Sequence, residues 1–195
     1  MIDLTQYDIF NRNLSDLKTT SIDTSKTPAV YMTDSTLSAI NFDEVKNEYV
    51  KPLGLSEVPK SNDALFATND GTIIFVEFKG GVMSENKKFG VRKKIYDSVL
   101  IFCDIVSEKI STLRNCAEYI LVYNEDVNST VESPEQPKVQ QSSSYDNIVQ
   151  SISGLAKTEH VRFGVNIFKN YCFKNVHTYT KAEFKNFLST LWLVG

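Results

Sequence analysis

The sequence predicts an α/β fold in which helices flank a mixed central β-sheet on both faces. Three observations lead to this class. A tight-turn signal, Asn69-Asp70-Gly71, separates two apolar segments that have the composition of strands. A long segment then places apolar residues three and four positions apart, which is typical of an amphipathic helix. A continuous apolar run over residues 119–123 is typical of a strand that is buried on both sides.

Each element has its own local signal. Asn41 to Glu44 forms a capping-box pattern that begins a short helix, and Pro52 and Gly54 end it. The turn at residues 69–71 predicts a β-hairpin, and Gly80-Gly81 ends its second strand. In order, we expect helices over 42–51, 85–110, 145–157 and 181–192, strands over 63–68, 72–79, 119–123 and 162–168, and a further candidate strand over 171–178. Residues 1–35 show weak periodicity and carry no assignment.

The length of 195 residues is that of one domain, and we expect residues 1–195 to form it. Residues 124–144 contain few hydrophobic side chains and two prolines, so we expect an exposed polar loop inserted into this domain. The first ten residues lack the pattern of a signal peptide, and no apolar run reaches the ~18–20 residues that span a membrane. These features favour a cytoplasmic protein with no membrane association.

The three cysteines, Cys103, Cys116 and Cys172, are widely spaced and lie in apolar segments. We expect them to be reduced core residues, because an odd number with no CxxC pair fits neither a disulfide framework nor a zinc site.

The net charge of −3 excludes a uniformly basic nucleic-acid coat protein. The charges are unevenly distributed, however, and residues 79–94 hold six Lys or Arg residues and one Glu. Cations at the beginning of a helix oppose its dipole, so helix stability does not explain them. The candidate phosphate contacts are Lys87, Lys88, Arg92, Lys93 and Lys94; the alternative, a solvated helix face, stays open.

The candidate catalytic residues are Asp63, Glu77 and Lys79. Glu77 and Lys79 are two apart on a strand and therefore share a face, and Asp63 lies opposite them across the hairpin. Two carboxylates and a lysine at one place suit a divalent cation such as Mg²⁺ or Mn²⁺, which prefers carboxylate oxygens. The pattern Asp/Glu-x-Lys alone is weak, since it occurs five times in the chain. The alternative is a solvated pair of charges on an exposed hairpin face.

The arrangement Asp63…Glu77-Phe78-Lys79, between a helix and a longer helix, resembles the active-site core of the PD-(D/E)XK nuclease superfamily. That resemblance implies a restriction-endonuclease-like three-layer fold with an α-β-β-β-α-β core, which residues 41–123 are expected to supply. It further implies that Asp63 and Glu77 bind the metal and that Lys79 positions the attacking water. An additional acidic ligand from the preceding helix is implied as well, for which Glu48 is favoured over the capping residue Glu44. Asn62 stands where the family pattern has proline.

The function expected from this resemblance is that of a Mg²⁺- or Mn²⁺-dependent endonuclease or exonuclease that hydrolyses phosphodiester bonds, with DNA as the favoured partner. Whether the chain is an enzyme stays open, because the superfamily includes inactive members. The alternative is a catalytically inactive module on the same fold that docks nucleic acid or a protein. A homodimer is compatible with either function, since nucleases that cut both strands commonly act as dimers.

Overall fold

The computed structural model describes residues 2–24, 28–128 and 161–191. The strands are β1 (Leu14–Asp16), β2 (Ile22–Asp23), β3 (Val30–Tyr31), β4 (Ser38–Asn41), β5 (Ala64–Ala67), β6 (Ile73–Lys79), β7 (Ala117–Tyr123) and β8 (Asn175–Thr180). The α-helices are α1 (Asp8–Arg12), α2 (Leu17–Thr20), α3 (Phe42–Val50), α4 (Glu85–Val106), α5 (Ile110–Cys116) and α7 (Lys181–Leu191). Short 3₁₀ helices cover Leu4–Gln6, Lys51–Leu53, Glu125–Val127 and Val165–Phe168.

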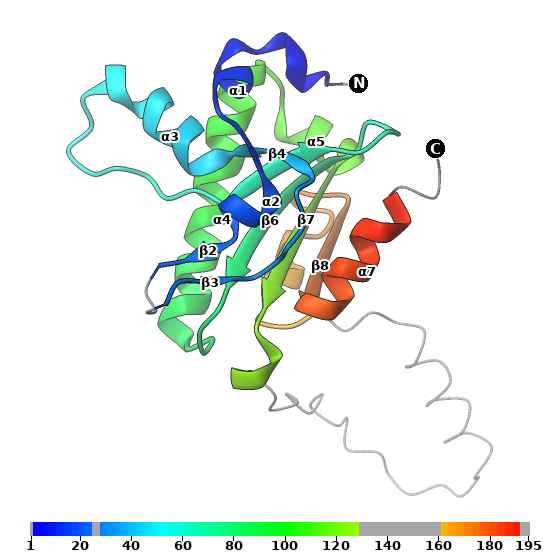
Figure 1. Cartoon of the computed structure of the whole chain (residues 1–195). Coiled ribbons are helices and arrows are strands. Elements are labelled where there is room, and N and C mark those ends of the chain that lie inside the picture. The colour runs from blue at the N-terminus through cyan, green and yellow to red at the C-terminus, as the bar shows by residue number, and fades with distance from the viewer. Residues whose placement is uncertain (1, 25–27, 129–160, 192–195) are drawn as a thin grey trace, which may run out of the picture.

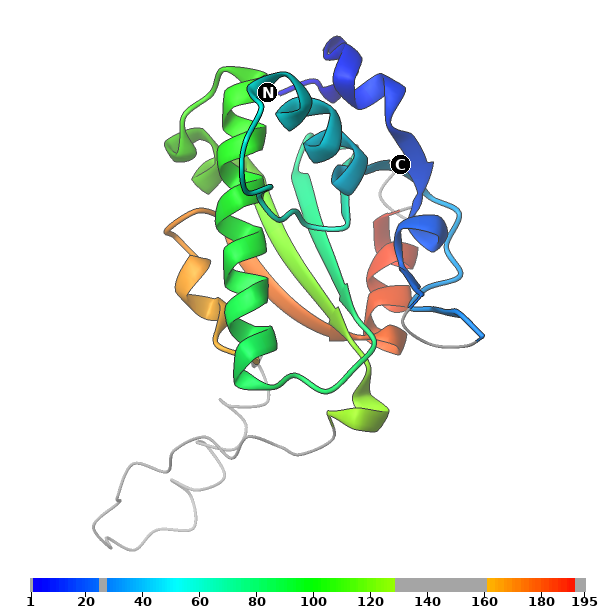
Figure 2. The ribbon, with the colours of Figure 1, turned by 90° about the vertical axis from the view of Figure 1, so that its left-hand side faces the viewer.

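One six-stranded sheet has the order β1-β4-β5-β6-β7-β8, and β2 pairs with β3 in a separate ladder (Figure 1). The pairs from β1 to β6 are antiparallel, whereas β6, β7 and β8 run parallel. Helix α4 lies across one face of the sheet and α7 lies on the other (Figure 2). The expected fold class, a mixed sheet with helices on both faces, is confirmed.

Each face of the sheet carries its own hydrophobic core. Strand β6 shows this most clearly, because its side chains alternate between the two cores. Ile73 and Phe75 pack with α3 and α4, while Ile74, Val76 and Phe78 pack with α7 and α2. The face that carries Glu77 and Lys79 is therefore covered by helix α4.

The local signals for the first helix and for the hairpin are confirmed. The Asn41 side chain accepts a hydrogen bond from the Glu44 amide at 3.3 Å, and Gly54 adopts the left-handed conformation after Leu53. The hairpin pairs Ala67 with Ile73, and Gly71 supplies the positive φ of 82° that its turn requires. These contacts fix the register that places Asp63 opposite Glu77.

The helix expected over residues 85–110 is too long. It ends at Val106, because Ser107 adopts a left-handed φ of 55° and its amide bonds back to the Asp104 carbonyl. Ile110 instead begins the separate helix α5. The apolar spacing continued across this break, so periodicity alone did not reveal it.

The strand expected over residues 162–168 is wrong. Phe163 and Gly164 both have positive φ, 61° and 65°, which no strand accommodates, and a 3₁₀ helix follows. The next strand, expected over 171–178, is present as β8 but begins at Asn175.

The segment 124–144, expected to be an exposed loop, begins with residues that pack against the rest of the domain. Asn124 and Asn128 are buried, and their side-chain amides donate to the carbonyls of Gly80 and Gly81, respectively. Asn128 also accepts a hydrogen bond from the Met83 amide at 2.9 Å. This segment therefore holds the connection between β6 and α4. The later part of the expected loop, the helix over 145–157 and the final residue of the last helix, Trp192, lie outside the described residues.

In the part of the chain that the structure describes, no helix combines the length and apolar character needed to cross a bilayer. All three cysteines are free; Cys172 is buried and the other two are half-buried.

Candidate functional site

The hairpin brings Asp63 and Glu77 together. Asp63 immediately precedes β5, and its amide donates to the Val76 carbonyl at 3.1 Å. Its carboxylate accepts a hydrogen bond from the Phe78 amide at 2.6 Å through Oδ2. This contact leaves Oδ1 facing the same side of the sheet as the Glu77 carboxylate. The sequence expectation that these residues lie opposite each other in the ladder is thus matched by the geometry.

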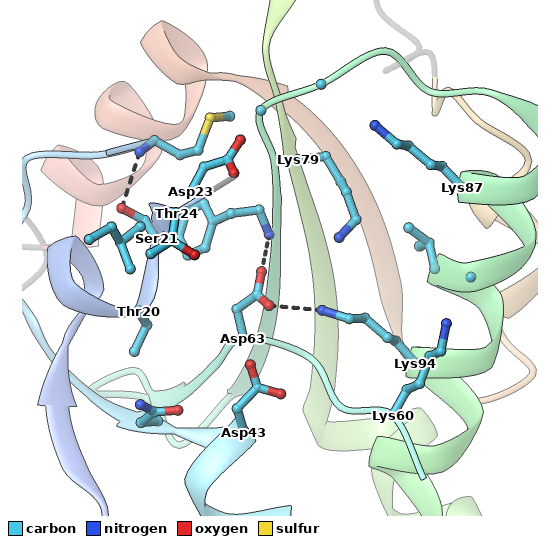
Figure 3. A pocket seen from close by; sticks show the side chains of 18 of the residues that line it. Thr20, Ser21, Asp23, Thr24, Asp43, Lys60, Asp63, Lys79, Lys87 and Lys94 are labelled. Carbon is cyan, nitrogen blue, oxygen red and sulfur yellow. Dashed lines mark hydrogen bonds and ion pairs between the residues drawn. The ribbon is translucent and has the colours of Figure 1, made fainter. Parts of the chain in front are cut away.

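Two lysines neutralise this pair of carboxylates. The Lys94 ammonium, from α4, lies 2.9 Å from Asp63 Oδ1 and 2.7 Å from Glu77 Oε1, so one cation joins both acids. Figure 3 shows its contact with Asp63. Lys79 forms a second ion pair with the same Glu77 oxygen. Glu77 has no exposed side-chain surface. It is therefore not a solvated residue on an open hairpin face, which removes that interpretation of the Glu77–Lys79 pair.

Behind the carboxylates, Asn62 holds Glu77 in place. Its side-chain amide donates to Glu77 Oε2 at 3.3 Å, and its backbone amide donates to the Ser98 hydroxyl at 2.7 Å. Asn62 and Ser98 are both fully buried. Ser98 lies one helical turn after Lys94, so α4 supplies both the bridging ammonium and the anchor for Asn62. The sequence showed that Lys94 and Ser98 share a helix face, but it gave no signal for Asn62 as a contact of Glu77.

Burial and charge move the pKa values of these groups in different directions. Burial and the neighbouring Glu77 charge raise the pKa of Asp63 to about 6. Burial also acts on Glu77, but the ammonium groups of Lys94 and Lys79 outweigh it and hold the pKa of Glu77 below its ordinary value. The two carboxylates outweigh burial at Lys94 and raise its pKa. Near pH 6, Asp63 is therefore the group of this cluster that exchanges a proton. Perturbed acids of this kind are common at functional sites.

Asp63, Lys79 and Lys94 line the floor of a cleft of about 590 Å³, and Glu77 lies beneath them with no exposed side-chain surface. Asp43 and Glu44, from the first turn of α3, also line the cleft, and Asp43 accepts a hydrogen bond from the Ser61 hydroxyl. Glu48, the favoured additional metal ligand, does not line it. Its carboxylate instead binds the Arg12 guanidinium at Oε1 and the Asn13 amide at Oε2. Glu48 lies about one helical turn after Glu44, where α3 contacts α1 and the residue that follows it. The acidic residues of α3 that the structure brings to the site are at its beginning.

The basic run at the beginning of α4 is divided among several surroundings. Lys87 lines the cleft, and Lys94 belongs to the carboxylate cluster on its floor. Lys93 pairs with Glu57 at 3.0 Å, and Lys88 forms an ion pair with Glu85 at 2.9 Å. Arg92 Nε is buried and has no hydrogen-bond partner among the residues that the structure describes. Of these five residues, the structure brings two to the candidate site.

The residues present fit a divalent ion with few protein ligands. Within residues 2–24, 28–128 and 161–191, no three His, Cys, Asp or Glu side chains converge in a way that would hold a metal. Asp63 and Glu77, however, are close enough to share one cation, as their contacts with Lys94 show. Mg²⁺ commonly binds proteins through one or two carboxylates and keeps water or substrate phosphate as its other ligands. The site matches that mode and does not match a closed structural metal centre.

Comparison with protein-family models, curated proteins and solved structures finds no match for this chain. The implied α-β-β-β-α-β order is met only in part. The elements α3, β5, β6, α4 and β7 follow in sequence, but β4, the neighbour of β5 in the sheet, precedes α3 instead of following it. Any function for the cleft is therefore argued from its own residues.

Proposed function

We propose that this chain is a metal-dependent nuclease that hydrolyses phosphodiester bonds, with DNA as the favoured substrate. The observation that carries the proposal is the pair of carboxylates, Asp63 and Glu77, which hold one cation between them where Asp63 and Lys94 line a cleft. Grouped buried charges of this kind contribute little to folding, because their desolvation offsets their attraction. Asp63, Lys79 and Lys94 line the cleft, so this part of the group is open to a substrate.

Asp63 and Glu77 are the residues that would hold Mg²⁺ or Mn²⁺, in the place that the Lys94 ammonium takes between them. Bound there, such an ion would lower the pKa of a water molecule and offset the charge that develops on a phosphate. Lys94 would then release the carboxylates and present its ammonium to the cleft, where it can neutralise a phosphate oxygen.

Lys79 is suited to hold the attacking water. Its side chain is 23% exposed, and its ammonium is fixed by Glu77 at the end of β6. In the hydrolysis, the water oxygen bonds to phosphorus, the bond to the leaving sugar oxygen breaks, and a proton passes to that oxygen. A positioned ammonium stabilises the negative charge that accumulates on the way.

One observation favours a second function. The two carboxylates and the two lysines balance in charge without any metal, as expected for a site that is inactive. The chain would then be a module that binds nucleic acid or a protein, with the cluster as a structural element. Such binding would need no divalent metal; for nucleic acid it would weaken steeply with salt.

The test is a cleavage assay of the purified chain with Mn²⁺ on single-stranded, duplex and branched DNA and on RNA. We expect cleavage that EDTA abolishes and that Lys79→Ala abolishes with the circular dichroism spectrum unchanged. Lys185→Ala is the matched control, because Glu183–Lys185 repeats the Glu-x-Lys pattern on the exposed surface of α7.

If all four substrates stay intact with Mn²⁺ and with Mg²⁺, the nuclease proposal fails. Salt-sensitive, EDTA-resistant binding in that case would establish nucleic-acid docking. Equal activity of Lys79→Ala and Lys185→Ala would instead remove Lys79 from the mechanism.

A further inference from the structure

The two walls of the cleft differ in charge. On the α4 side, Lys60 and Lys87 extend from the wall, and both are exposed (Figure 3). Lys60 lies against α4, since its Nζ is 3.9 Å from where a Cβ on Gly90 would be. The opposite side carries the hydroxyl groups of Thr20, Ser21 and Thr24 and the carboxylate of Asp23 (Figure 3). One wall is therefore cationic, and the other is polar and acidic.

The walls come close together where β6 ends. A Cβ on Gly80 would lie 2.6 Å from Asp23 Oδ2, and a Cβ on Gly81 would lie 2.7 Å from Lys87 Nζ. These glycines are consecutive, so their Cα atoms are only ~3.8 Å apart. An acidic residue of one wall and a lysine of the other thus reach neighbouring residues of the same short segment. The cleft is narrow at this end, and the glycines leave room for both side chains.

The reacting groups lie at the bottom of this narrow space. Asp63 and Lys94 expose only 15% and 20% of their side chains, and Glu77 exposes none. The cleft volume of about 590 Å³ is that of a site for a small organic molecule. A phosphate can reach the carboxylates only if its own strand enters the cleft, and a paired strand would have to enter with it.

We propose that the cleft accepts one unpaired nucleic-acid strand, whose phosphates lie along the lysine wall formed by Lys60 and Lys87. This inference rests on the proposed function, because it names the substrate class of the same site. The bases would face the opposite wall at Thr24, which is exposed; the hydroxyl groups of Thr20 and Ser21 already donate to backbone carbonyls, and Ser21 is buried. A duplex is disfavoured, because the phosphates of its second strand would face Asp23 and Asp43.

Strand preference is measured by fluorescence anisotropy in EDTA, which prevents cleavage. The probes are an unstructured DNA oligonucleotide of about 15 nucleotides, its blunt duplex, and an RNA of the same sequence. We expect the single strands to bind at least about tenfold more tightly than the duplex. The two single-stranded probes distinguish DNA from RNA as the source of the strand.

Lysine substitutions test the wall. We expect Lys60→Gln/Lys87→Gln to weaken single-strand binding and to lower the slope of log affinity against log salt by about 1.4, since two phosphate contacts are lost. The matched control is Lys51→Gln/Lys169→Gln, which removes the same charge from two exposed positions outside the cleft.

The acidic residues of the cleft are tested by Asp23→Asn/Asp43→Asn, which should raise duplex affinity several-fold and so reduce the preference for a single strand. Duplex affinity equal to that of the single strand would overturn the inference, and so would equal salt slopes for the cleft and control lysine variants. Cleavage of duplex DNA in Mn²⁺ together with equal affinities would refute the strand preference and leave the nuclease proposal standing. A clear single-strand preference without any cleavage would support the strand preference and refute the nuclease proposal.

Discussion

Replacing Lys94 by methionine tests how the carboxylate cluster is held together. Lys94 is the only contact that joins Asp63 to Glu77 among the ion pairs of the described residues. Methionine keeps much of the side-chain volume but leaves the two acids with one remaining counter-ion, Lys79. Removing one partner from a buried ion pair destabilises a protein by ~3–5 kcal/mol. We expect a loss of stability of that order in urea denaturation at neutral pH.

The neighbouring residue provides the matched control. Lys93 lies on the same helix and has an ion pair of almost the same length, 3.0 Å, but its partner Glu57 is 82% exposed. Water screens such a pair, so Lys93→Met should shift the urea midpoint by only a small fraction of the shift in Lys94→Met.

Divalent metal should rescue the Lys94 variant. Without the ammonium, Asp63 and Glu77 have room for Mn²⁺, which should restore up to ~2.7 kcal/mol at a concentration 100-fold above its dissociation constant. Potassium chloride at equal ionic strength should have no such effect. Equal midpoints for Lys94→Met and Lys93→Met would refute the reasoning, because they would mean that the cluster is not desolvated. Failure of rescue alone would count against a metal site.

Three further outcomes are expected. The pKa of Asp63 is raised from its ordinary 3.8 to about 6, so between these values the folded protein keeps a proton there that the unfolded chain loses. The stability contributed by this group therefore falls as pH rises from about 4 to 6. Urea titrations across that window should show this slope in the parent chain and lose it in Asp63→Asn. Ser98→Ala leaves the buried Asn62 amide without its acceptor and should cost ~1–3 kcal/mol in the same assay. Glu48→Gln should leave Mn²⁺ affinity, measured by calorimetry, unchanged, because the Glu48 carboxylate binds Arg12 outside the cleft; a tenfold loss would return Glu48 to the site.

The sequence predicted the parts of the fold that depend on short-range signals. The turn at Gly71 and the apolar strands on either side fixed the hairpin, and the two-residue period of a strand put Glu77 and Lys79 on one face. The capping pattern at Asn41 likewise fixed the beginning of α3. In each case the residues that determine the structure lie within a few positions of one another.

The errors have a common physical cause. Helix α4 ends at Val106. The residue that follows it in the left-handed conformation is Ser107, which has no strong preference for that conformation, so no local signal marked the break. Phe163 and Val165 are buried through a tight turn and a 3₁₀ helix, and their apolar spacing resembles that of a strand. Tertiary packing determines the backbone conformation at both places.

The residues of the candidate site also differ in whether short-range signals or tertiary packing determine their contacts. Asp63, Glu77 and Lys79 were found because the hairpin alone brings them together. The role of Lys94 depends on how α4 lies across the sheet, and its place in a basic run suggested a contact with phosphate instead. Asn62 was noted only for replacing a proline, and its contact with Glu77 requires the full packing of β5 against α4.

Glu77 is a fully buried charged residue within β6, a strand covered on both faces, and this position has an evolutionary consequence. Exchanging a buried ionic cluster for well-packed apolar side chains is often neutral or stabilising by ~1–4 kcal/mol. The sheet would therefore tolerate a leucine in place of Glu77 if Asp63, Lys79 and Lys94 were made apolar as well. Selection for stability alone would erode these charges over time. If relatives of this chain retain these charged residues, selection acts on the chemistry of the cluster. If relatives replace them with apolar residues, those relatives keep the fold without that chemistry.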